Sequence, residues 1–299
     1  MPIRKKYTVN KNNYYERLDR FLRNALKELK LGSIFKLIRT GNVLINGRKA
    51  KKPFLKLSIG DTIELRYSGN VEPLKRLKEK REPKALNLPL EFIYEDEFLI
   101  AINKPPGISV HPGKGIQIVT IIEGLIAYGK DKDFKPRLVH RLDKHTSGVL
   151  VVAKTPEAAR RMTEMFRTRN IDKYYVTLIK GKLENESGKL IDQEGNDKME
   201  LKYSIRNIYD ICSLIDVKLL TGKKHQIRIQ FSNIGNPVLG DYVYGDRELN
   251  DYFRKVHNLR RYFIHCSLME FDHPFTGSRV SLNSALPDDL GNVIKSIEQ

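Results

Sequence analysis

The chain has no tryptophan and only two cysteines among its 299 residues, and these scarcities narrow its chemistry. Cys212 and Cys266 lie far apart in sequence and neither belongs to a C-x-x-C pair. This argues against a disulfide framework and against a thiolate zinc site. The seven histidines show no HxxxH or HExxH spacing. No metal site is therefore predicted.

Long apolar runs are also missing. No apolar stretch approaches the roughly 20 residues that cross a bilayer, so no membrane-spanning segment is expected. The first 18 residues, MPIRKKYTVNKNNYYERL, contain no apolar core of the secretory-signal kind. Together with the sparse cysteines, this favours a reducing cytoplasm. An apolar content of 40% indicates a globular chain with a proper core.

Acidic residues are scarce in one part of the chain. Residues 1–86 carry 23 Lys and Arg against 8 Asp and Glu, whereas the rest carries 31 against 28. Nearly all of the net charge of +18 therefore lies in the N-terminal third. Repulsion among these positive charges opposes folding of this part of the chain. A polyanionic partner that neutralises them is therefore favoured over a basic surface that contacts only water. Nucleic acid is the first candidate, and an anionic membrane surface is the second. No segment has the clear apolar face of a membrane-surface helix, so no membrane partner is expected.

Local patterns divide the N-terminal third. Apolar residues recur with helical spacing in residues 16–29, and residues 33–41 predict a second short helix. Asn46-Gly47 is a hairpin-turn signal between two strand-like pieces. We assign residues 1–15 to an N-terminal extension and 16–68 to a small helical and β domain. Residues 69–86 are charge-dense, contain two prolines and predict a linker.

The helix–helix–hairpin pattern resembles the S4 RNA-binding domain. The resemblance rests on Arg17-Leu18-Asp19, Ile38-Arg39-x-Gly41-x-Val43 and Val43-x-Ile45-Asn46-Gly47. In that family the helical pair and the turn after it lie on structured RNA. The resemblance implies phosphate contacts by Arg17, Arg20, Arg39, Arg48, Lys49, Lys51 and Lys52. A free surface charge is the alternative for each of them.

A different pattern begins at residue 87. Strand-like segments outnumber helices and do not alternate with them regularly, which favours an α+β fold with a mainly antiparallel mixed sheet. Residues 155–169 predict a helix that Thr155 caps and Pro156 begins. We assign residues 87–299 to this second domain.

The segment HRLDKHTSG, residues 140–148, places one acid, Asp143, in a basic turn before the buried strand signal VLVVA. A turn attached to a rigid strand is a good place for a catalytic group. An aspartate in a turn more often caps a backbone donor, so catalysis and capping both remain open from this segment alone.

A second polar segment is HQIRIQF, residues 225–231. Its alternation predicts a strand with Arg228 on one face between two glutamines. A half-buried arginine needs a carboxylate, and Asp143 is the expected partner. An ionised aspartate held by an arginine can act as a nucleophile.

These segments resemble the RluA family of RNA pseudouridine synthases, and four further elements extend the resemblance in the family's order over about residues 87–285. HRLDKHTSG resembles the HRLDxxTSG motif, and residues 222–228 resemble G-x-x-HQIR. The other elements are Asn103-Lys104-Pro105-Pro106-Gly107 with Val110-His111-Pro112, Lys173-Tyr174-Tyr175, Ile234-Gly235-Asn236-Pro237 with Gly240-Asp241 and Tyr244-Gly245, and His265 with His273-Pro274.

The resemblance implies residue roles. Asp143 would attack the target uridine, after which the uracil would rotate and rejoin through C5. Tyr175 would stack on the uracil and Arg228 would pair with Asp143. Arg141 would enter the RNA where the flipped uridine leaves. The substrate site would also include His140 and Ile227. No cofactor is implied.

The implied function is conversion of specific uridines to pseudouridine. The front domain favours large-subunit ribosomal RNA, with transfer RNA as the other substrate class and a monomer as the default state. A non-catalytic RNA-binding or ribosome-assembly protein explains the charge but leaves residues 140–148 and 222–228 without a purpose. A uracil-releasing glycosylase is the enzymatic alternative. A Ser–His–Asp hydrolase is disfavoured because Ser147, His140 and Asp143 are too close in sequence.

Overall fold

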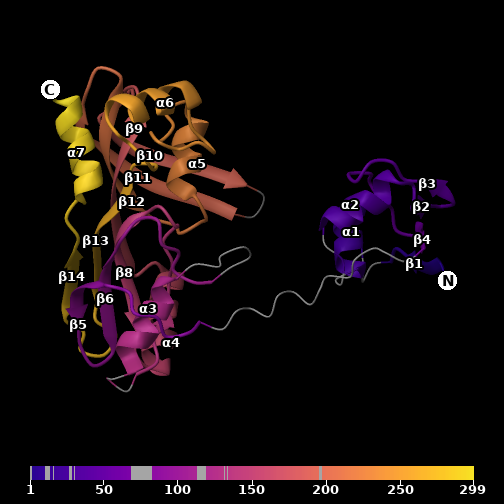
Figure 1. Cartoon of the computed structure of the whole chain (residues 1–299), viewed down its shortest axis with the longest axis horizontal. Helices are drawn as coiled ribbons and strands as arrows, with labels where there is room; N and C mark the ends of the chain where they lie inside the picture. The colour runs from indigo at the N-terminus through magenta and orange to yellow at the C-terminus, as the bar shows by residue number, and fades with distance from the viewer. Residues whose placement is uncertain are drawn as a thin grey trace. The chain divides into compact units, whose positions relative to one another are not determined.

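The computed structural model describes residues 2–10, 14–15, 17–26, 29, 31–68, 83–112, 119–130, 132, 134–194 and 197–299 (Figure 1). The chain divides into two units, residues 1–81 and residues 82–299. Most of the linker predicted at residues 69–86 lies outside the described residues. Within the described ranges, no helix has the length and apolar character needed to cross a membrane.

The first unit packs two helices on a four-stranded sheet of order β1-β4-β2-β3. The helices are α1 (Leu18–Ala25) and α2 (Leu31–Arg39). The strands are β1 (Pro2–Thr8), β2 (Val43–Ile45), β3 (Arg48–Lys49) and β4 (Thr62–Ser68). Leu22, Ile34 and Ile63 bring both helices and the sheet into one core.

The hairpin predicted from Asn46-Gly47 is confirmed. Both residues have positive φ, +49° and +79°, as a two-residue type I′ turn between β2 and β3 requires. The Asn46 side chain also accepts the Thr62 backbone N–H at 2.8 Å. The turn is therefore tied to the first residue of β4.

Residues 2–8 were expected to belong to an extension, but they form the edge strand β1, which pairs antiparallel with β4. Arg4, Lys5 and Lys6 interrupt the apolar alternation by which a strand is recognised. Charged residues are well tolerated on an edge strand, where they discourage pairing with other chains. This strand therefore could not be predicted from alternation of apolar and polar residues.

The second unit is built on a ten-stranded sheet of order β10-β11-β12-β9-β13-β8-β6-β5, with β14 beside β13 and β7 beside β8. The strands are β5 (Glu91–Glu95), β6 (Leu99–Lys104), β7 (Arg137–Leu138), β8 (Ser147–Ala153), β9 (Ile171–Lys180), β10 (Ser187–Glu194), β11 (Asp197–Ile208), β12 (Cys212–Leu219), β13 (Ile264–Asp272) and β14 (Arg279–Asn283). The helices are α3 (Ile121–Lys130), α4 (Pro156–Thr168), α5 (Gln226–Asn233), α6 (Arg247–Val256) and α7 (Asp288–Ile297).

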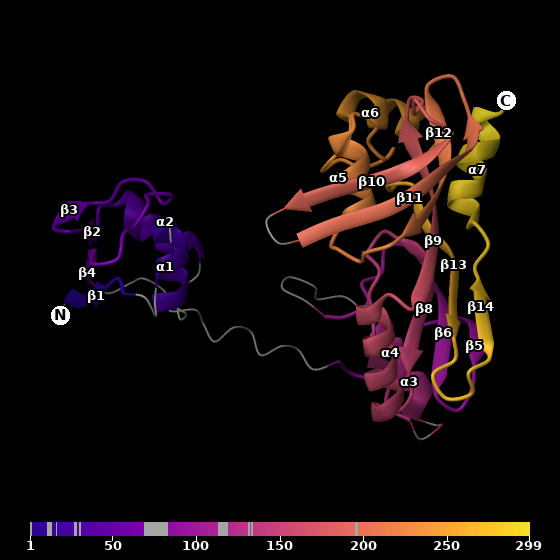
Figure 2. The same ribbon diagram turned by 180° about the vertical axis from the view of Figure 1, so that it is seen from behind.

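The α+β class and the mixed, mainly antiparallel sheet are confirmed. Figures 1 and 2 show α3 and α4 toward the end of the unit that holds β5, and α5 and α6 toward the other end. A short parallel pairing of β13 with β8 lies between the antiparallel halves, with His265 opposite Ser147 and Cys266 opposite Gly148. The strand β8 is buried along its whole length, as its β-branched sequence predicted.

One secondary-structure prediction near the site is wrong. Residues 225–231 do not form a strand, because α5 begins at Gln226. A short alternating segment also fits a helix that is buried on most sides. In α5 the side-chain amide of Gln226 donates to that of Gln230 one turn later at 2.9 Å, and Ile227 and Phe231 are both buried. The glutamines therefore bond to each other rather than line a strand face.

Gly148 is where β8 and β13 come closest. Its φ is +109°, and a Cβ added there would lie 2.1 Å from the carbonyl oxygen of Cys266. Replacing Gly148 with alanine should destabilise the second unit by more than about 4 kcal/mol, because positive φ and backbone overlap both act against a side chain. Thermal unfolding measures the loss.

Gly277→Ala is the matched control. Gly277 also has positive φ, +71°, but a Cβ there meets nothing within 4 Å. It should cost only the conformational penalty of about 1–2 kcal/mol. Equal unfolding temperatures for the two variants would contradict the close approach of β8 and β13.

Candidate active site

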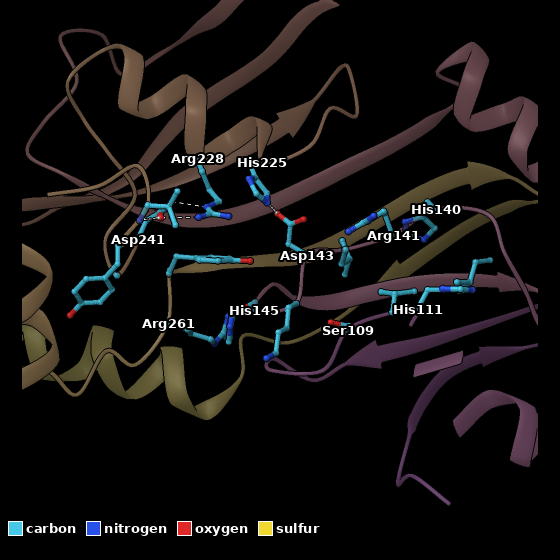
Figure 3. Close-up of a pocket in the computed structure, with 18 of the residues that line it drawn as sticks. Ser109, His111, His140, Arg141, Asp143, His145, His225, Arg228, Asp241 and Arg261 are labelled. Atoms are coloured by element: carbon cyan, nitrogen blue, oxygen red, sulfur yellow. Dashed lines mark hydrogen bonds and ion pairs between the residues drawn. The ribbon is translucent and has the colours of Figure 1, made fainter. Parts of the chain in front are cut away.

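Asp143 lies in the turn that leads into β8, and its side chain is 22% exposed (Figure 3). The turn is closed by the Thr146 N–H, which donates to the backbone carbonyl of Asp143 at 3.1 Å. No hydrogen bond from the described residues to the Asp143 carboxylate is recorded, so capping does not explain this acid. Its carboxylate faces the cavity instead.

Two buried cations hold the backbone of this turn. Lys104, at the end of β6, is fully buried, and its Nζ donates to the carbonyls of Lys144 at 3.2 Å and Thr146 at 2.8 Å. Arg261 Nη1 donates to the carbonyl between them, that of His145, at 2.9 Å. Three consecutive carbonyl oxygens are thereby fixed directly after Asp143.

The two cations differ in how they are stabilised. Burial, reinforced by the charge of Arg261, lowers the pKa of Lys104 to about 7, while Asp143 acts in the opposite direction. Arg261 has a carboxylate partner, since its Nε donates to Asp289 of α7 at 2.6 Å, and its Nη2 also donates to the Ser147 hydroxyl at 3.0 Å. The turn is thus anchored both to β6 and to the C-terminal helix.

Arg228 does not pair with Asp143, and that prediction is wrong. Its Nε and Nη2 donate to both carboxylate oxygens of Asp241, at 2.6 and 2.8 Å (Figure 3). Burial works against the charge, but the bonds to Asp241 keep the pKa of Arg228 above its ordinary value. The guanidinium lies 4.9 Å from the Tyr244 ring centroid and 4.4 Å from that of Tyr262. Arg228 is therefore a fixed positive charge near Asp143 rather than its ion-pair partner.

His225 lies beside the Asp143 carboxylate, with Nε2 3.8 Å from Oδ2. It precedes α5 with a positive φ of +57°. Its other ring nitrogen lies 3.0 Å from the Tyr244 hydroxyl. Burial lowers the pKa of His225 while Asp143 opposes the change, so the ring is neutral at pH 7. A neutral imidazole leaves the carboxylate unpaired and available.

Tyr175 on β9 and Ile227 on α5 are both buried. Cys266 lies opposite Tyr175 in the pairing of β13 with β9. Burial, followed by the influence of Cys266 and Asp143, raises the pKa of Tyr175 well above its ordinary value. The phenol therefore keeps its proton at neutral pH and presents an apolar ring with a neutral hydroxyl.

Two cavities meet at Asp143. One has a volume of about 850 Å³ and the other about 570 Å³. Tyr175 and Ile227 line only the smaller cavity, whereas Tyr242 and Tyr262 line only the larger. The residues that line both are Val139, His140, Arg141, Leu142, Asp143, His225 and Arg228. Asp143 therefore lies where two parts of one cleft join.

Arg141 and His140 differ in what they can do. Arg141 is exposed at the cleft, where its guanidinium is accessible to a ligand. His140 accepts the Val151 backbone N–H at 2.9 Å and stacks on Phe166 with centroids 4.6 Å apart. Burial, with a contribution from Lys173, lowers the pKa of His140 to about 3. His140 is thus a neutral wall of the cleft, unsuited to binding phosphate.

The seven cations predicted to contact phosphate in the first unit fall into two groups. Arg17 forms an ion pair with Asp19 at 2.9 Å and its guanidinium lies 4.5 Å from the Phe54 ring centroid, so it also stabilises the unit. The other six are exposed: Arg20, Arg39, Arg48, Lys49, Lys51 and Lys52. Their contacts with RNA stay a prediction.

Sequence reasoning assigned no role to several residues that build this site. Lys104, His225 and Asp241 stood inside recognised motifs, but nothing local showed what they contact. Nothing in the sequence indicated a role for Arg261 in the site, because an arginine near the end of a loop is usually interpreted as a surface charge. Within the described part of the chain, no group of three or more His, Cys, Asp or Glu is arranged to hold a metal ion.

Comparisons with known sequences agree with this geometry. Residues 98–233 match the family model described as RNA pseudouridylate synthase, and residues 16–63 match the S4 domain. The Ribosomal large subunit pseudouridine synthase C of Vibrio vulnificus (strain CMCP6) is 32% identical, over 94% of this chain and 93% of that protein. The protein of the same name from Escherichia coli (strain K12) is 32% identical, over 94% and 93%. Both resemblances drawn from the sequence are confirmed.

The fold is found in a solved structure as well. Human RNA Pseudouridylate Synthase Domain Containing 4 superposes with a TM-score of 0.59 at 23% identity, over 70% of this chain and 93% of that one. At that identity the likeness shows the fold alone.

Lys104 tests the anchoring of the Asp143 turn. Lys104→Met should destabilise the protein by about 2–4 kcal/mol and lower its activity, because buried carbonyls lose their donor. The folded lysine has a pKa of about 7 against 10.5 when unfolded, so from pH 7 to pH 10 the unfolded chain binds more protons. Wild-type stability should therefore rise relative to the variant over this range.

Thermal unfolding at several pH values measures the loss of stability and the change of stability with pH. Lys130→Met, at the exposed end of α3, is the control and should change neither stability nor its pH dependence. A Lys104→Met protein as stable as the control would show that the turn does not depend on these bonds.

Proposed function

The chain belongs to the RNA pseudouridylate synthase family and is an RNA pseudouridine synthase, and from this premise we propose that it converts uridines of large-subunit ribosomal RNA with Asp143 as the nucleophile. The observation that carries the proposal is the Asp143 carboxylate, which stands where two cavities join and, among the residues that the structure describes, has only the neutral His225 ring as an ion-pair candidate. The substrate class is supported by the names of the relatives from Vibrio and Escherichia.

The reaction uses groups present in the cleft. Asp143 forms a bond to C1′ of the ribose as the C1′–N1 bond breaks, and the electron pair stays with the uracil. The freed base rotates and C5 attacks C1′, which displaces the carboxylate. The hydrogen on C5 then leaves as a proton, and N1 gains one. No oxidant or reductant is needed, because the product is an isomer of the substrate.

The smaller cavity suits a detached uracil. Tyr175 and Ile227 give it apolar walls, and a neutral tyrosine ring can stack on the base, an interaction worth roughly 1–3 kcal/mol. Arg228, held by Asp241, places a fixed positive charge near the negative charge that passes between carboxylate and base. Burial limits escape of the free base before C5 bonds.

Arg141 is proposed to occupy the space that the flipped uridine leaves in the RNA. It is exposed beside Asp143 and adjoins both cavities, so one residue separates the intercalating group from the nucleophile. The six exposed cations of the first unit are proposed to hold phosphates farther along the RNA.

Further properties follow for the protein in the cell. We propose a monomer as the default state. A cytoplasmic location accords with ribosomal RNA as substrate and with Cys212 and Cys266, which are free thiols.

Tritium release from ribosomal RNA labelled at C5 of uridine tests the proposal, since C5 loses its hydrogen only if a new bond forms there. Asp143→Asn should lower release by more than about a thousandfold, as expected when a nucleophile is removed. Asp272→Asn, an aspartate 71% exposed on β13, should leave it unchanged. Release from transfer RNA alone would overturn the ribosomal substrate, and release by Asp143→Asn would overturn the nucleophile.

Salt dependence of RNA binding tests the role of the first unit. Replacing Arg39, Arg48 and Lys51 with alanine should lower the slope of log K against log salt by about 2–3, because each lost phosphate contact removes about 0.7–0.9. Replacing the exposed Lys130, Lys255 and Lys295 of the second unit is the control with the same change in charge. Equal slopes for the two triple variants would refute this placement of the phosphate contacts.

A further inference from the structure

The larger cavity contains a surface that the isomerisation does not use. If the target uridine lies against Tyr175 and Ile227, it occupies the smaller cavity, and about 850 Å³ of cleft on the other part remains. Tyr242 and Val243 line this remainder. Figure 3 shows Arg228 and Asp241 on one side of Asp143, and Asp241 directly precedes Tyr242 and Val243 in the lining of this cavity.

The exposure of these two residues is unusual for their surroundings. Tyr242 is 48% exposed and Val243 is 71% exposed, whereas the four residues before them, 238–241, are all buried. Two adjacent large apolar side chains in a cleft are a feature of binding surfaces. The RNA chain must leave the smaller cavity through this cleft or along its rim. The nucleotides next to the target uridine are therefore the groups that can contact Tyr242 and Val243.

The turn that presents Tyr242 and Val243 is rigid. The carboxylate of Asp241 accepts the backbone N–H of Val243 at 2.9 Å and of Tyr244 at 3.2 Å while it also binds Arg228. The Tyr242 hydroxyl donates to Asp251 at 2.9 Å, which orients the ring. A preorganised ring loses little freedom when a ligand stacks on it.

Charge around the cavity indicates the kind of ligand. Besides Arg141, the exposed cations Lys144 and Arg260 line it, and both lie where a sugar–phosphate chain could reach them. An aromatic side chain among cations is the arrangement that holds single-stranded nucleic acid, with the ring stacking on a base and the cations on phosphates. A protein partner seated here would block the catalytic cleft.

We propose that the turn 241–245 is a stacking subsite, in which Tyr242, supported by Val243, binds an unpaired base next to the target uridine. The inference rests on the proposed function, because it takes the smaller cavity as the uridine site. It makes Tyr242 a binding residue that selects RNA in which the neighbouring nucleotide is free to unstack from its own helix.

The test uses a synthetic RNA that contains a uridine mapped by tritium release, made with its natural neighbours or with an abasic nucleotide on the 5′ or the 3′ side. Tyr242→Ala should raise KM and lower kcat/KM about 5- to 100-fold on the natural RNA, with kcat retained. Tyr242→Phe keeps the ring and should lose less. Tyr252→Ala, another tyrosine 45% exposed but outside the cleft lining, should match the wild type.

The abasic RNAs separate stacking from a structural effect. One of them should lower wild-type kcat/KM by the same factor as Tyr242→Ala, and the variant should lose nothing further on it. Equal kcat/KM for Tyr242→Ala and wild type, or equal additional losses of the variant on all RNAs, would overturn the subsite. A wild-type protein that releases no tritium from any RNA would instead refute the proposed function, and the subsite with it.

Discussion

Three consecutive backbone carbonyls, those of residues 144–146, face two buried cations, and the catalytic cleft depends on this contact. Lys104 and Arg261 come from distant parts of the chain and donate to alternate carbonyls of the same turn. Buried carbonyls need donors, and buried ammonium and guanidinium groups need acceptors. Each side satisfies the other, and the arrangement fixes the direction of Asp143 without using its carboxylate. The acid therefore stays available for chemistry inside a strongly basic segment.

A second interaction, that of Asp241 with Arg228, neutralises positive charge on the opposite wall of the cleft. Asp241 binds the Arg228 guanidinium and two backbone N–H groups of its own turn, so one carboxylate holds a cation and shapes a loop together. The positive charge of Arg228 is thus neutralised by Asp241 rather than by Asp143. The proposed uridine pocket and the proposed stacking turn are linked through this residue.

The sequence predicted features that local physics determines. The Thr155 cap of α4 was predicted from its place before Pro156, and in the structure its side chain accepts the Ala158 N–H. The strand β8 was predicted from its β-branched run. Partners distant in sequence were not predictable in this way. The pattern around Arg228 showed that a carboxylate was required, but not that Asp241 rather than Asp143 supplies it. The alternation of residues 225–231 fitted a strand and a buried helix equally, and only the packing of Ile227 and Phe231 distinguishes them.

The parallel pairing of β13 with β8 can form only late in the synthesis of the chain. The bonds between Arg261 and the His145 carbonyl and between the Ser147 hydroxyl and His265 join residues 116 and 118 positions apart. At translation rates of about 5–20 residues per second, the turn is complete roughly 6–24 s after Asp143 is synthesised. Residues 1–81 are finished well before then and have their own core. A nascent chain therefore has the core of its first unit while the turn after Asp143 still lacks its anchors, so the first unit can fold before the cleft is complete.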